Sequence, residues 1–528
     1  MTMQTQPAAT GLLGRLRSLG TVWRDISDKV SSADDLSSLN PDLPEEDARK
    51  IRAGMDACLE ARGGEVSARA RAATLGRAYL SLNDTGRARF LEILARDYAT
   101  DHDRVRDAAA AVLAVQDDHI IALQWAEGRL RDVLVSPRQR LLTQFNALPR
   151  GIKFLVDMRA DLLPLARERP ELRGLERDLR DLLASWFDIG FLELQRITWE
   201  SPAAFLEKII TYEAVHEIQS WDDLKNRLDH DRRLYAFIHP NMPEEPLIFV
   251  EVALVNGIAG NIQALLDMDA PMLDPEEADT AIFYSISNAQ AGLAGISFGN
   301  FLIKQVVERL SHAFPKLSTF STLSPIPGFC GWLDRRLAEG EPGLLLPAER
   351  KAITQATGEA KAGRAAEAAG EAGVEVKPQK NGQKNGQKNG QKNGKTGKAA
   401  RPLLGAKGSF KTLLAAPDWP EHDPLAAALK GPMTRLCARY LVNERRPARQ
   451  DGRLPVALDP VAHFHLSNGA RVERLNWMGD RSPKGLRQAG GLMVNYLYKL
   501  SDIERNHEAY QGQGKVATST AIRNLAKG

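Results

Sequence analysis

The sequence predicts an α+β protein in which an N-terminal all-α helical bundle precedes a domain built on a mixed β-sheet. Residues 1–185 are rich in Ala, Leu, Arg and Glu, and their apolar residues recur three and four positions apart, as in amphipathic helices. Beyond about residue 186, short β-branched and aromatic runs alternate with helical patterns, as in a sheet covered by helices. We therefore expect one domain over residues 1–185 and a second over residues 186–528.

The helical periodicity is clearest in two segments of the first domain. Residues 70–99 have apolar side chains at helical spacing, and the cluster from Asn83 to Gly86 divides them into two helices. Residues 151–165 repeat the pattern. The many arginines alternate with Asp and Glu, as on solvated helix faces, and no catalytic constellation is evident. Subunit assembly and simple packing are both open as roles for this domain.

The second domain begins with a series of predicted strands. Residues 234–238, 247–255 and 280–287 are apolar, β-branched and aromatic, and each run is short enough for a buried strand. A helix with apolar residues from 301 to 310 follows, and then a strand that ends at Ser324 and another helix. This order predicts a mixed sheet with helices packed on it.

The C-terminal part of the second domain follows a low-complexity insert. Residues from about 355 to 400 contain a recurring Lys-Asn-Gly-Gln unit without apolar side chains, which predicts a disordered spacer; non-specific contact with polyanions is the alternative. Residues 433–442 indicate a helix. Strand-like residues 462–466 and 472–477 flank a Ser-Asn-Gly turn signal, so we expect a hairpin there. A last helix is expected over roughly residues 485–500.

Composition and charge narrow the class of protein. Of the 528 residues, 43% are hydrophobic and 26% are charged, and the net charge of +3 does not suggest a nucleic-acid binder. No apolar run approaches the roughly 18 residues that span a bilayer, and the N-terminal residues show no secretory signal. Cys58, Cys330 and Cys437 lie far apart, which suits a reducing compartment and predicts no metal site. We expect a cytoplasmic enzyme or adaptor that binds neither membrane nor nucleic acid.

Ser324 is a candidate functional residue because it stands at the tip of a predicted strand. Pro325 and Pro327 follow it, and proline cannot continue a strand ladder. Strand tips in α/β sheets are common ligand sites. The same residues also fit a plain strand-to-helix turn in which Ser caps and Pro punctuates.

A glycine-bearing segment, residues 290–303, lies between a predicted strand and a predicted helix. Its glycines allow backbone N–H groups to approach a ligand closely, and the start of the helix supplies partial positive charge. This combination suits a pyrophosphate, although simple turn chemistry explains it too. The segment is neither a P-loop, because no Gly-Lys-Ser/Thr follows, nor a dinucleotide fingerprint.

Two histidines and two tyrosines are further candidates. His465 and His463 would share one face of their predicted strand, but a metal pair would need a third ligand, and none is evident nearby. Histidine is the natural proton donor or acceptor near neutral pH, while a structural role is equally compatible. His239 at a strand end has a similar status. Tyr496 and Tyr498, on the predicted last helix, fit core or interface positions.

Several of these motifs together resemble the malonyl-CoA decarboxylase family. They are the glycine-bearing loop and four stretches: Gly-Ile-Lys-Phe-Leu-Val-Asp-Met-Arg at 151–159, Leu-Ser-Pro-Ile-Pro-Gly-Phe at 323–329, Phe-His-Leu-Ser-Asn-Gly-Ala at 464–470 and Gly-Leu-Met-Val-Asn-Tyr at 491–496. The resemblance covers nearly all of the chain except the N-terminal tip and the insert. It implies a helical domain followed by a catalytic domain of the GCN5-related acetyltransferase fold, which converts malonyl-CoA to acetyl-CoA and CO2 without an added cofactor.

The resemblance also implies site residues. It assigns catalysis to Ser324 and His465, with Tyr496 in a supporting role as an acid. It assigns binding of the CoA pyrophosphate to a loop that departs from the acetyltransferase consensus at its first and fourth residues, and whose residues are Ala294, Gly295, Ile296, Ser297, Phe298, Gly299 and Asn300.

The implied chemistry is loss of CO2 from a malonyl thioester, which leaves an enolate that hydrogen bonds can stabilise. Ser324 would orient the malonyl carboxylate or relay a proton, and His465 would protonate the acetyl carbon or stabilise the enolate oxygen. A CoA-dependent acyltransferase is the alternative that the fold permits. The family further implies self-association into a tetramer or dimer, and a role in fatty-acid metabolism or in malonate catabolism.

Overall fold

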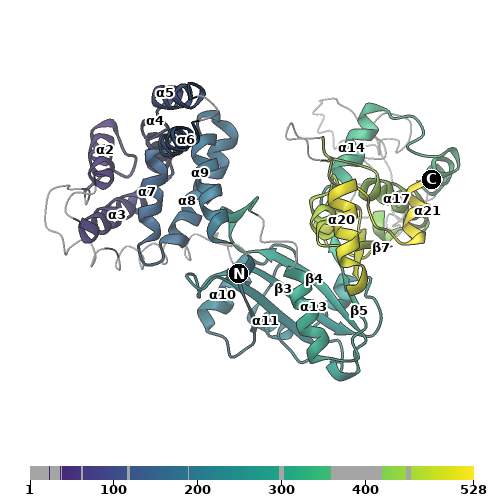
Figure 1. The fold of residues 1–528 in the computed structure, drawn as a ribbon. Helices are drawn as coiled ribbons and strands as arrows, with labels where there is room; N and C mark the ends of the chain where they lie inside the picture. The colour runs from purple at the N-terminus through teal and green to yellow at the C-terminus, as the bar shows by residue number, and fades with distance from the viewer. Residues whose placement is uncertain are drawn as a thin grey trace, which may run out of the picture. The chain divides into compact units, whose positions relative to one another are not determined.

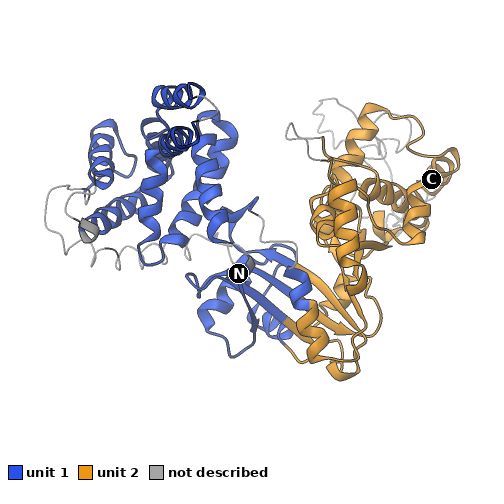
Figure 2. Cartoon of the chain, in the orientation of Figure 1, with its two compact units in different colours: residues 1–228, 234–250, 286–306 blue, residues 229–233, 251–285, 307–528 orange. Residues whose placement is uncertain are grey.

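The computed structural model describes residues 23, 36, 38–60, 64–115, 119–187, 189–296, 302–357, 419–447 and 454–527 (Figure 1). The chain divides into two compact units (Figure 2). The first unit comprises residues 1–228, 234–250 and 286–306, and the second comprises residues 229–233, 251–285 and 307–528. The expected division into domains at residue 185 stays a prediction.

The N-terminal part of the chain is helical, as predicted. Asn83 caps the second of the two helices expected over residues 70–99, and its side chain accepts the Gly86 N–H at 3.0 Å. This cap provides the chain break that the sequence indicated there. The helices are α2 (Glu45–Leu59), α3 (Gly64–Ser81), α4 (Asp84–Asp97), α5 (His102–Leu113), α6 (Ile120–Leu134), α7 (Pro137–Asn146), α8 (Gly151–Glu168) and α9 (Arg173–Trp186).

The packing of these helices combines aromatic contacts with buried ion pairs. The ring of Tyr79 lies edge-on to those of Phe90 and Phe154, with centroids 5.1 and 5.7 Å apart. Arg138 is buried and donates to the Asp178 carboxylate at 2.6 Å and to a backbone carbonyl, that of residue 95, at 2.9 Å. A buried guanidinium needs such partners, because an unpaired charge in the interior is costly.

The later part of the chain contains a mixed sheet, which confirms the predicted fold class of a helical region followed by a mixed-sheet domain. The strand order is β1-β2-β3-β4-β5-β8-β6, and β7 pairs with β8. The pair β4–β5 is parallel, whereas β1–β2, β5–β8, β6–β8 and β7–β8 are antiparallel. The strands are β1 (Glu193–Ile197), β2 (Arg232–Ile238), β3 (Pro246–Val255), β4 (Thr280–Asn288), β5 (Thr319–Thr322), β6 (Ser324–Pro325), β7 (Arg471–Asn476) and β8 (Met493–Tyr498).

Helices occur between these strands and after the last of them. The predicted helices near residues 301–310 and 433–442 are confirmed as α13 and α17. The helices are α10 (Ala203–Tyr212), α11 (Trp221–Arg227), α12 (Ile262–Leu265), α13 (Leu302–Ala313), α14 (Phe329–Glu339), α17 (Asp423–Val442), α18 (Pro460–Ser467), α19 (Pro483–Ala489), α20 (Ile503–Gln513) and α21 (Thr520–Lys527).

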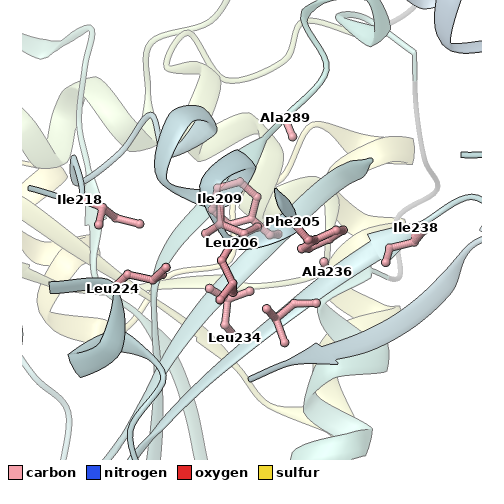
Figure 3. Packing of buried hydrophobic residues seen from close by; sticks show 11 residues of the cluster. Phe205, Leu206, Ile209, Ile218, Leu224, Leu234, Ala236, Ile238 and Ala289 are labelled. Carbon is pink, nitrogen blue, oxygen red and sulfur yellow. The ribbon is translucent and has the colours of Figure 1, made fainter. Parts of the chain in front are cut away.

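Each unit has a cluster of buried apolar side chains against its strands. In the first unit, Leu234, Ala236 and Ile238 alternate along β2 and pack with side chains of α10 and α11 (Figure 3). In the second unit, Leu323 packs with Met493 and other buried side chains of β3, β4 and α12. Full burial of one leucine contributes roughly 2 kcal/mol, so Leu323 anchors the end of β5 where the chain enters β6.

The predicted hairpin around residues 462–477 is wrong in its first strand. Residues Pro460–Ser467 form helix α18, and only the second element is a strand, β7, which pairs with β8. Asp459 provides the N-cap of α18, and Pro460 occupies the first turn, where proline is well tolerated. The run of apolar residues is short, and periodicity alone does not separate a buried helix from a strand at that length.

The predicted last helix over residues 485–500 is also wrong in its second half. Helix α19 ends at Ala489, and Gly490 and Gly491 both have positive φ, at 58° and 79°. Glycine adopts this conformation without steric cost, so the pair ends the helix and lets the chain enter β8. Tyr496 and Tyr498 therefore lie on a strand.

Two further expectations concern the insert near residues 355–400 and the absence of a membrane-spanning helix. Of the predicted disordered insert, only residues 355–357 are described, and they are helical; the rest of it, with the Lys-Asn-Gly-Gln units, lies outside the described residues. Among the described helices, none has the length and apolar character required to cross a membrane.

Candidate active site

Ser324 lies in β6, a two-residue strand that is separated from β5 by Leu323. It pairs with Val494 of β8 in antiparallel register, and the N–H of Leu323 just before it donates to the Phe283 carbonyl at 2.9 Å. The ladder ends at Pro325, as the lack of a proline N–H requires. The side chain of Ser324 is thus held at the end of a short strand, and the residue is only 5% exposed.

His465 lies in the last turn of α18 and points toward Ser324. The residue is 3% exposed, and its Nε2 atom lies 3.1 Å from the Ser324 Oγ atom. The two residues are 141 positions apart in the sequence. The fold therefore brings the two predicted site residues into hydrogen-bond contact.

Tyr498 is the residue that sequence reasoning missed as a partner of the histidine. Its hydroxyl lies 2.8 Å from Nδ1 of His465. Tyr496, the predicted supporting residue, instead stacks its ring on the imidazole, with centroids 4.5 Å apart, and its buried hydroxyl has no hydrogen-bond partner among the described residues. The sequence could have indicated Tyr498, because residues two apart on a strand face the same side and Tyr496 was already a candidate. That inference was missed because both tyrosines were expected on a helix.

A chain of hydrogen bonds defines the tautomer of His465. Thr322 Oγ1 accepts the Ser324 hydroxyl at 2.8 Å and the Tyr496 N–H at 3.1 Å. If Tyr498 donates to Nδ1, then Nε2–H donates to Ser324, and each of these donors has an acceptor. In the other tautomer, the buried hydroxyl proton of Tyr498 would have no acceptor among the described residues, at a cost of about 1–3 kcal/mol. We therefore assign the imidazole proton to Nε2.

The hydrogen-bonded groups are uncharged at neutral pH. Burial lowers the pKa of His465 to about 3, because the imidazolium would lose its hydration. Burial also raises the pKa of Tyr498 well above its ordinary value, so the phenol keeps its proton. The result is a line of neutral donors and acceptors that ends at the strand tip.

Asp459 connects the two segments that hold this pair. One carboxylate oxygen accepts the Val461 and Ala462 N–H groups, both at 2.9 Å, and so caps α18. The other oxygen accepts the Tyr440 hydroxyl at 3.2 Å and the Gly328 N–H at 3.4 Å. Burial raises the pKa of Asp459 above its ordinary value, and these hydrogen bonds oppose the rise. The carboxylate therefore joins the helix of His465 to the segment that follows Ser324.

His463 does not share a face with His465, because both lie on a helix and not on a strand. Its Nδ1 atom lies 3.0 Å from the Tyr510 hydroxyl and 3.3 Å from the Ser467 hydroxyl. The predicted common face of the two histidines is therefore wrong. Among the described residues, no group of three or more His, Cys, Asp or Glu side chains is arranged to hold a metal ion.

The glycine-bearing loop lies in the first unit, while Ser324 and His465 lie in the second. Residues Ala291–Leu293 form a short 3-10 turn, η4, after β4, and Gly295 adopts a positive φ of 77°. The loop then leads toward α13, so it has the predicted place between strand and helix. Of the seven predicted substrate-binding residues, Ala294, Gly295 and Ile296 are described, and Ser297, Phe298, Gly299 and Asn300 lie outside the described residues.

His239, the other histidine considered, lies at the end of β2. It is buried, and its Nε2 atom is 3.1 Å from the backbone carbonyl of Trp186. Its other ring nitrogen accepts the Asn241 N–H at 3.1 Å. Because both ring nitrogens bind backbone groups, this side chain has a structural role.

Comparison with protein families gives two matches that together span most of the chain. Residues 190–528 match the family described as malonyl-CoA decarboxylase C-terminal domain, and residues 98–187 match the malonyl-CoA decarboxylase N-terminal domain. Among curated proteins, the chain is similar to the mitochondrial malonyl-CoA decarboxylases of Anser anser anser and Rattus norvegicus. The first is 38% identical over 83% of this chain and 79% of the relative, and the second is 37% identical over 83% and 81%.

Solved structures show the same likeness. The crystal structure of malonyl-CoA decarboxylase from Rhodopseudomonas palustris is 40% identical, with a TM-score of 0.71, over 90% of this chain and 99% of the other. The corresponding structure from Agrobacterium vitis is 39% identical, with a TM-score of 0.70 and the same coverage. Each of these likenesses extends over both the helical and the mixed-sheet parts of the chain.

Proposed function

The chain belongs to the malonyl-CoA decarboxylase family, and on this premise we propose that it converts malonyl-CoA to acetyl-CoA and CO2 with Ser324 and His465 at the reacting acyl group. The observation that supports this assignment of residues is the contact of Ser324 with His465 inside a buried chain of uncharged groups. Such a chain can supply hydrogen bonds to developing negative charge in surroundings from which water is excluded.

The first step is cleavage of the bond between C2 of the malonyl group and its carboxylate carbon. The bonding electrons move onto C2 and into the thioester, which gives CO2 and an enolate. A hydrogen bond to the thioester oxygen strengthens as this charge develops, so it lowers the barrier. We assign this donor to Nε2–H of His465, which stays neutral because burial lowers the pKa of the imidazole to about 3.

The second step is transfer of a proton to C2 of the enolate. A thioester enolate is a strong base at carbon, so a neutral hydroxyl suffices as the acid. The Ser324 hydroxyl turns from Thr322 toward C2 and gives up its proton. Once the thioester carbonyl has re-formed, Nε2–H of His465 bonds Ser324 again and replaces the lost proton. Tyr498 gives its own proton to Nδ1, which keeps the imidazole neutral, and one proton from solvent restores the phenol in each turnover.

The test of this function is incubation of the purified protein with malonyl-CoA and no acceptor molecule. A decarboxylase releases CO2 and acetyl-CoA in equal amounts under these conditions. A CoA-dependent acyltransferase, the alternative that the fold permits, would leave malonyl-CoA unchanged until an acceptor is added. Stable malonyl-CoA in this assay would contradict the proposal.

We further propose that the loop from Ala294 to Asn300 binds the pyrophosphate of CoA. Backbone N–H groups at a glycine turn before a helix form a suitable site for an anion. Gly295 supports this role, because its positive φ of 77° belongs to the region that favours glycine, and the position where a Cβ would lie is open.

We propose that the chain self-associates as a dimer or tetramer through its helical region. Helix α6 supports this, because Ile120, Ile121 and Trp125 are 64%, 73% and 78% exposed, and none of its described residues is buried. Exposed apolar patches of this kind mark interaction sites. Sedimentation analysis measures the association, and a monomer at all protein concentrations would contradict it.

Removal of malonyl-CoA in fatty-acid metabolism and catabolism of malonate are the two physiological roles that we propose for this activity. The proposed location is the cytoplasm. The curated animal relatives are mitochondrial by name, so cell fractionation of the source organism is the measurement that decides the location.

A further inference from the structure

A buried arginine of the helical region, Arg159 of α8, contacts the glycine-bearing loop. The residue is 1% exposed. Its guanidinium donates to the carbonyl of Gly292 and, at 2.9 Å, to that of Ala294. It also donates to the Glu176 carboxylate of α9 at 2.7 Å, which balances its charge. One side chain of the bundle therefore binds two carbonyls of the loop.

The loop and helix α8 are packed together at this point. A Cβ atom on Gly292 would lie 1.7 Å from the Val156 carbonyl oxygen, a distance that no side chain tolerates. Only glycine permits this close approach of two backbones. The 3-10 turn η4 thus packs directly against α8, and the hydrogen bonds from Arg159 hold it in that position.

The bond to Ala294 determines where the next amide points. In a planar trans peptide the carbonyl and the following N–H point in opposite directions, so an inward Ala294 carbonyl turns the Gly295 N–H outward. Gly295 is exposed, and its N–H has no hydrogen-bond partner among the described residues. A buried charged donor on the carbonyl holds this orientation more firmly than a neutral one.

We propose that Arg159 is a positioning residue for binding of the CoA pyrophosphate, because it holds the Ala294–Gly295 peptide with its N–H directed toward the anion. The guanidinium does not touch the substrate; it acts through the backbone of the loop. The inference rests on the proposed role of the loop in the decarboxylase. It gives the helical region a part in substrate binding that is separate from assembly.

The test compares two thioesters and two variants of the full-length protein. Malonyl-CoA contains the pyrophosphate, and malonyl-pantetheine lacks it. Arg159→Lys keeps the charge but cannot reproduce the planar fork that reaches two carbonyls. Arg138→Lys is the matched control. Arg138 of α7 is likewise buried in the helical region with a carboxylate and a backbone carbonyl as partners, but neither partner belongs to the loop.

Arg159→Lys is expected to raise KM for malonyl-CoA by about tenfold, the loss expected for one charge-assisted hydrogen bond, with kcat close to that of the parent. With malonyl-pantetheine the variant should match the parent, and Arg138→Lys should match the parent with both thioesters. Equal losses on both thioesters, or no loss on malonyl-CoA, would overturn the inference. Failure of the parent to release CO2 from malonyl-CoA would instead overturn the proposed function.

A second variant keeps the proposal testable if Arg159→Lys does not fold. Glu176→Gln retains an oxygen acceptor but weakens the ion pair that orients the guanidinium. It should raise KM for malonyl-CoA in the same direction by a smaller factor, and it should leave malonyl-pantetheine unaffected. An unchanged KM for malonyl-CoA in this variant would count against the inference.

Discussion

Helix α18 carries two histidine–tyrosine pairs that differ in surroundings rather than in chemistry. His465 Nδ1 lies 2.8 Å from the Tyr498 hydroxyl, and His463 Nδ1 lies 3.0 Å from the Tyr510 hydroxyl. The first pair is continued by a serine hydroxyl at a strand tip. In the second pair, Tyr510 also accepts the Ala457 N–H at 2.8 Å, so this hydroxyl supports backbone structure.

The contrast shows that the neighbours of a histidine, and not its residue type, determine what it can do. The Tyr510 hydroxyl accepts a backbone N–H and lies within hydrogen-bond distance of Nδ1 of His463, which makes the pair a structural link. In the other pair, Nε2–H of His465 donates to the hydroxyl of Ser324, and that hydroxyl has a proton that it can transfer. His463 and His465 are only two positions apart on α18, yet the first has a structural role and the second is a candidate catalytic residue.

The largest expected effect distinguishes the two histidines directly. His465→Asn should lower kcat by about a thousandfold, because it removes the donor assigned to the enolate oxygen and the source of the serine proton. His463→Asn is the matched control on the same helix and should keep most of the parent activity. Steady-state release of acetyl-CoA measures both. Full turnover by His465→Asn would break the contrast and remove that histidine from the mechanism.

The next effect concerns the carboxylate that connects α18 to the Ser324 segment. Asp459→Asn keeps an oxygen that can cap α18, but it presents an amide NH2 group, and no longer an acceptor, to the Gly328 N–H. The change should therefore misplace Ser324 relative to His465 and lower kcat by about a hundredfold. KM should change little. Ser482→Ala, which removes the cap of α19, is the control; it should cost about 1 kcal/mol of stability without loss of kcat. Parent-like kcat in Asp459→Asn would show that the helix cap alone is its role.

A smaller effect sharpens the comparison of the two tyrosines. Tyr498→Phe removes the hydrogen bond to Nδ1 of His465, so it should lower kcat by about tenfold. Tyr510→Phe removes the equivalent bond to His463 and should reduce thermal stability, since the Ala457 N–H loses its acceptor, while kcat stays near the parent value. Equal kcat losses in the two variants would contradict a special role for Tyr498.

The smallest expected effect is that of pH, because kcat/KM should change little across the weakly acidic range. Since burial lowers the pKa of His465 to about 3 from an unfolded value of 6.5, the imidazole stays neutral through the weakly acidic range. We expect no acidic limb in kcat/KM with a midpoint near 6.5. Such a limb, if it disappeared in His465→Asn, would show that this histidine titrates near its ordinary pKa and that the neutral-donor mechanism is wrong.

The same pKa has a consequence for stability, with its sign set by linkage. Below pH 6.5 the unfolded chain binds a proton at His465 that the folded chain excludes, so folding loses stability as the pH falls from 6.5 toward 3. The fall in Tm between pH 7 and pH 5 should therefore be smaller in His465→Asn than in the parent, as measured by thermal unfolding. An equal or larger fall in the variant would contradict the buried, neutral state.

The sequence by itself determined many of the local features of this protein. The helices at residues 70–99 and 151–165 and the strands near 234–238, 247–255 and 280–287 follow from periodicities that depend on neighbouring residues alone. The end of the strand at Ser324 and Pro325 also follows from the local sequence, because proline has no N–H to donate in any fold. The glycine-bearing loop lies between a strand and a helix, as predicted, because both of these elements follow from local sequence patterns.

Only the tertiary structure decided which side chains meet. Residues near 462–466 could be read as a strand, and the cap from Asp459 together with packing made them a helix, which separates His463 from His465. Tyr498 is the tyrosine bonded to His465 because β8 pairs beside the strand tip, a contact between residues far apart in sequence. Arg159 reaches the loop from a helix more than a hundred positions earlier. Long-range hydrogen bonds of this kind depend on packing, which no local pattern encodes.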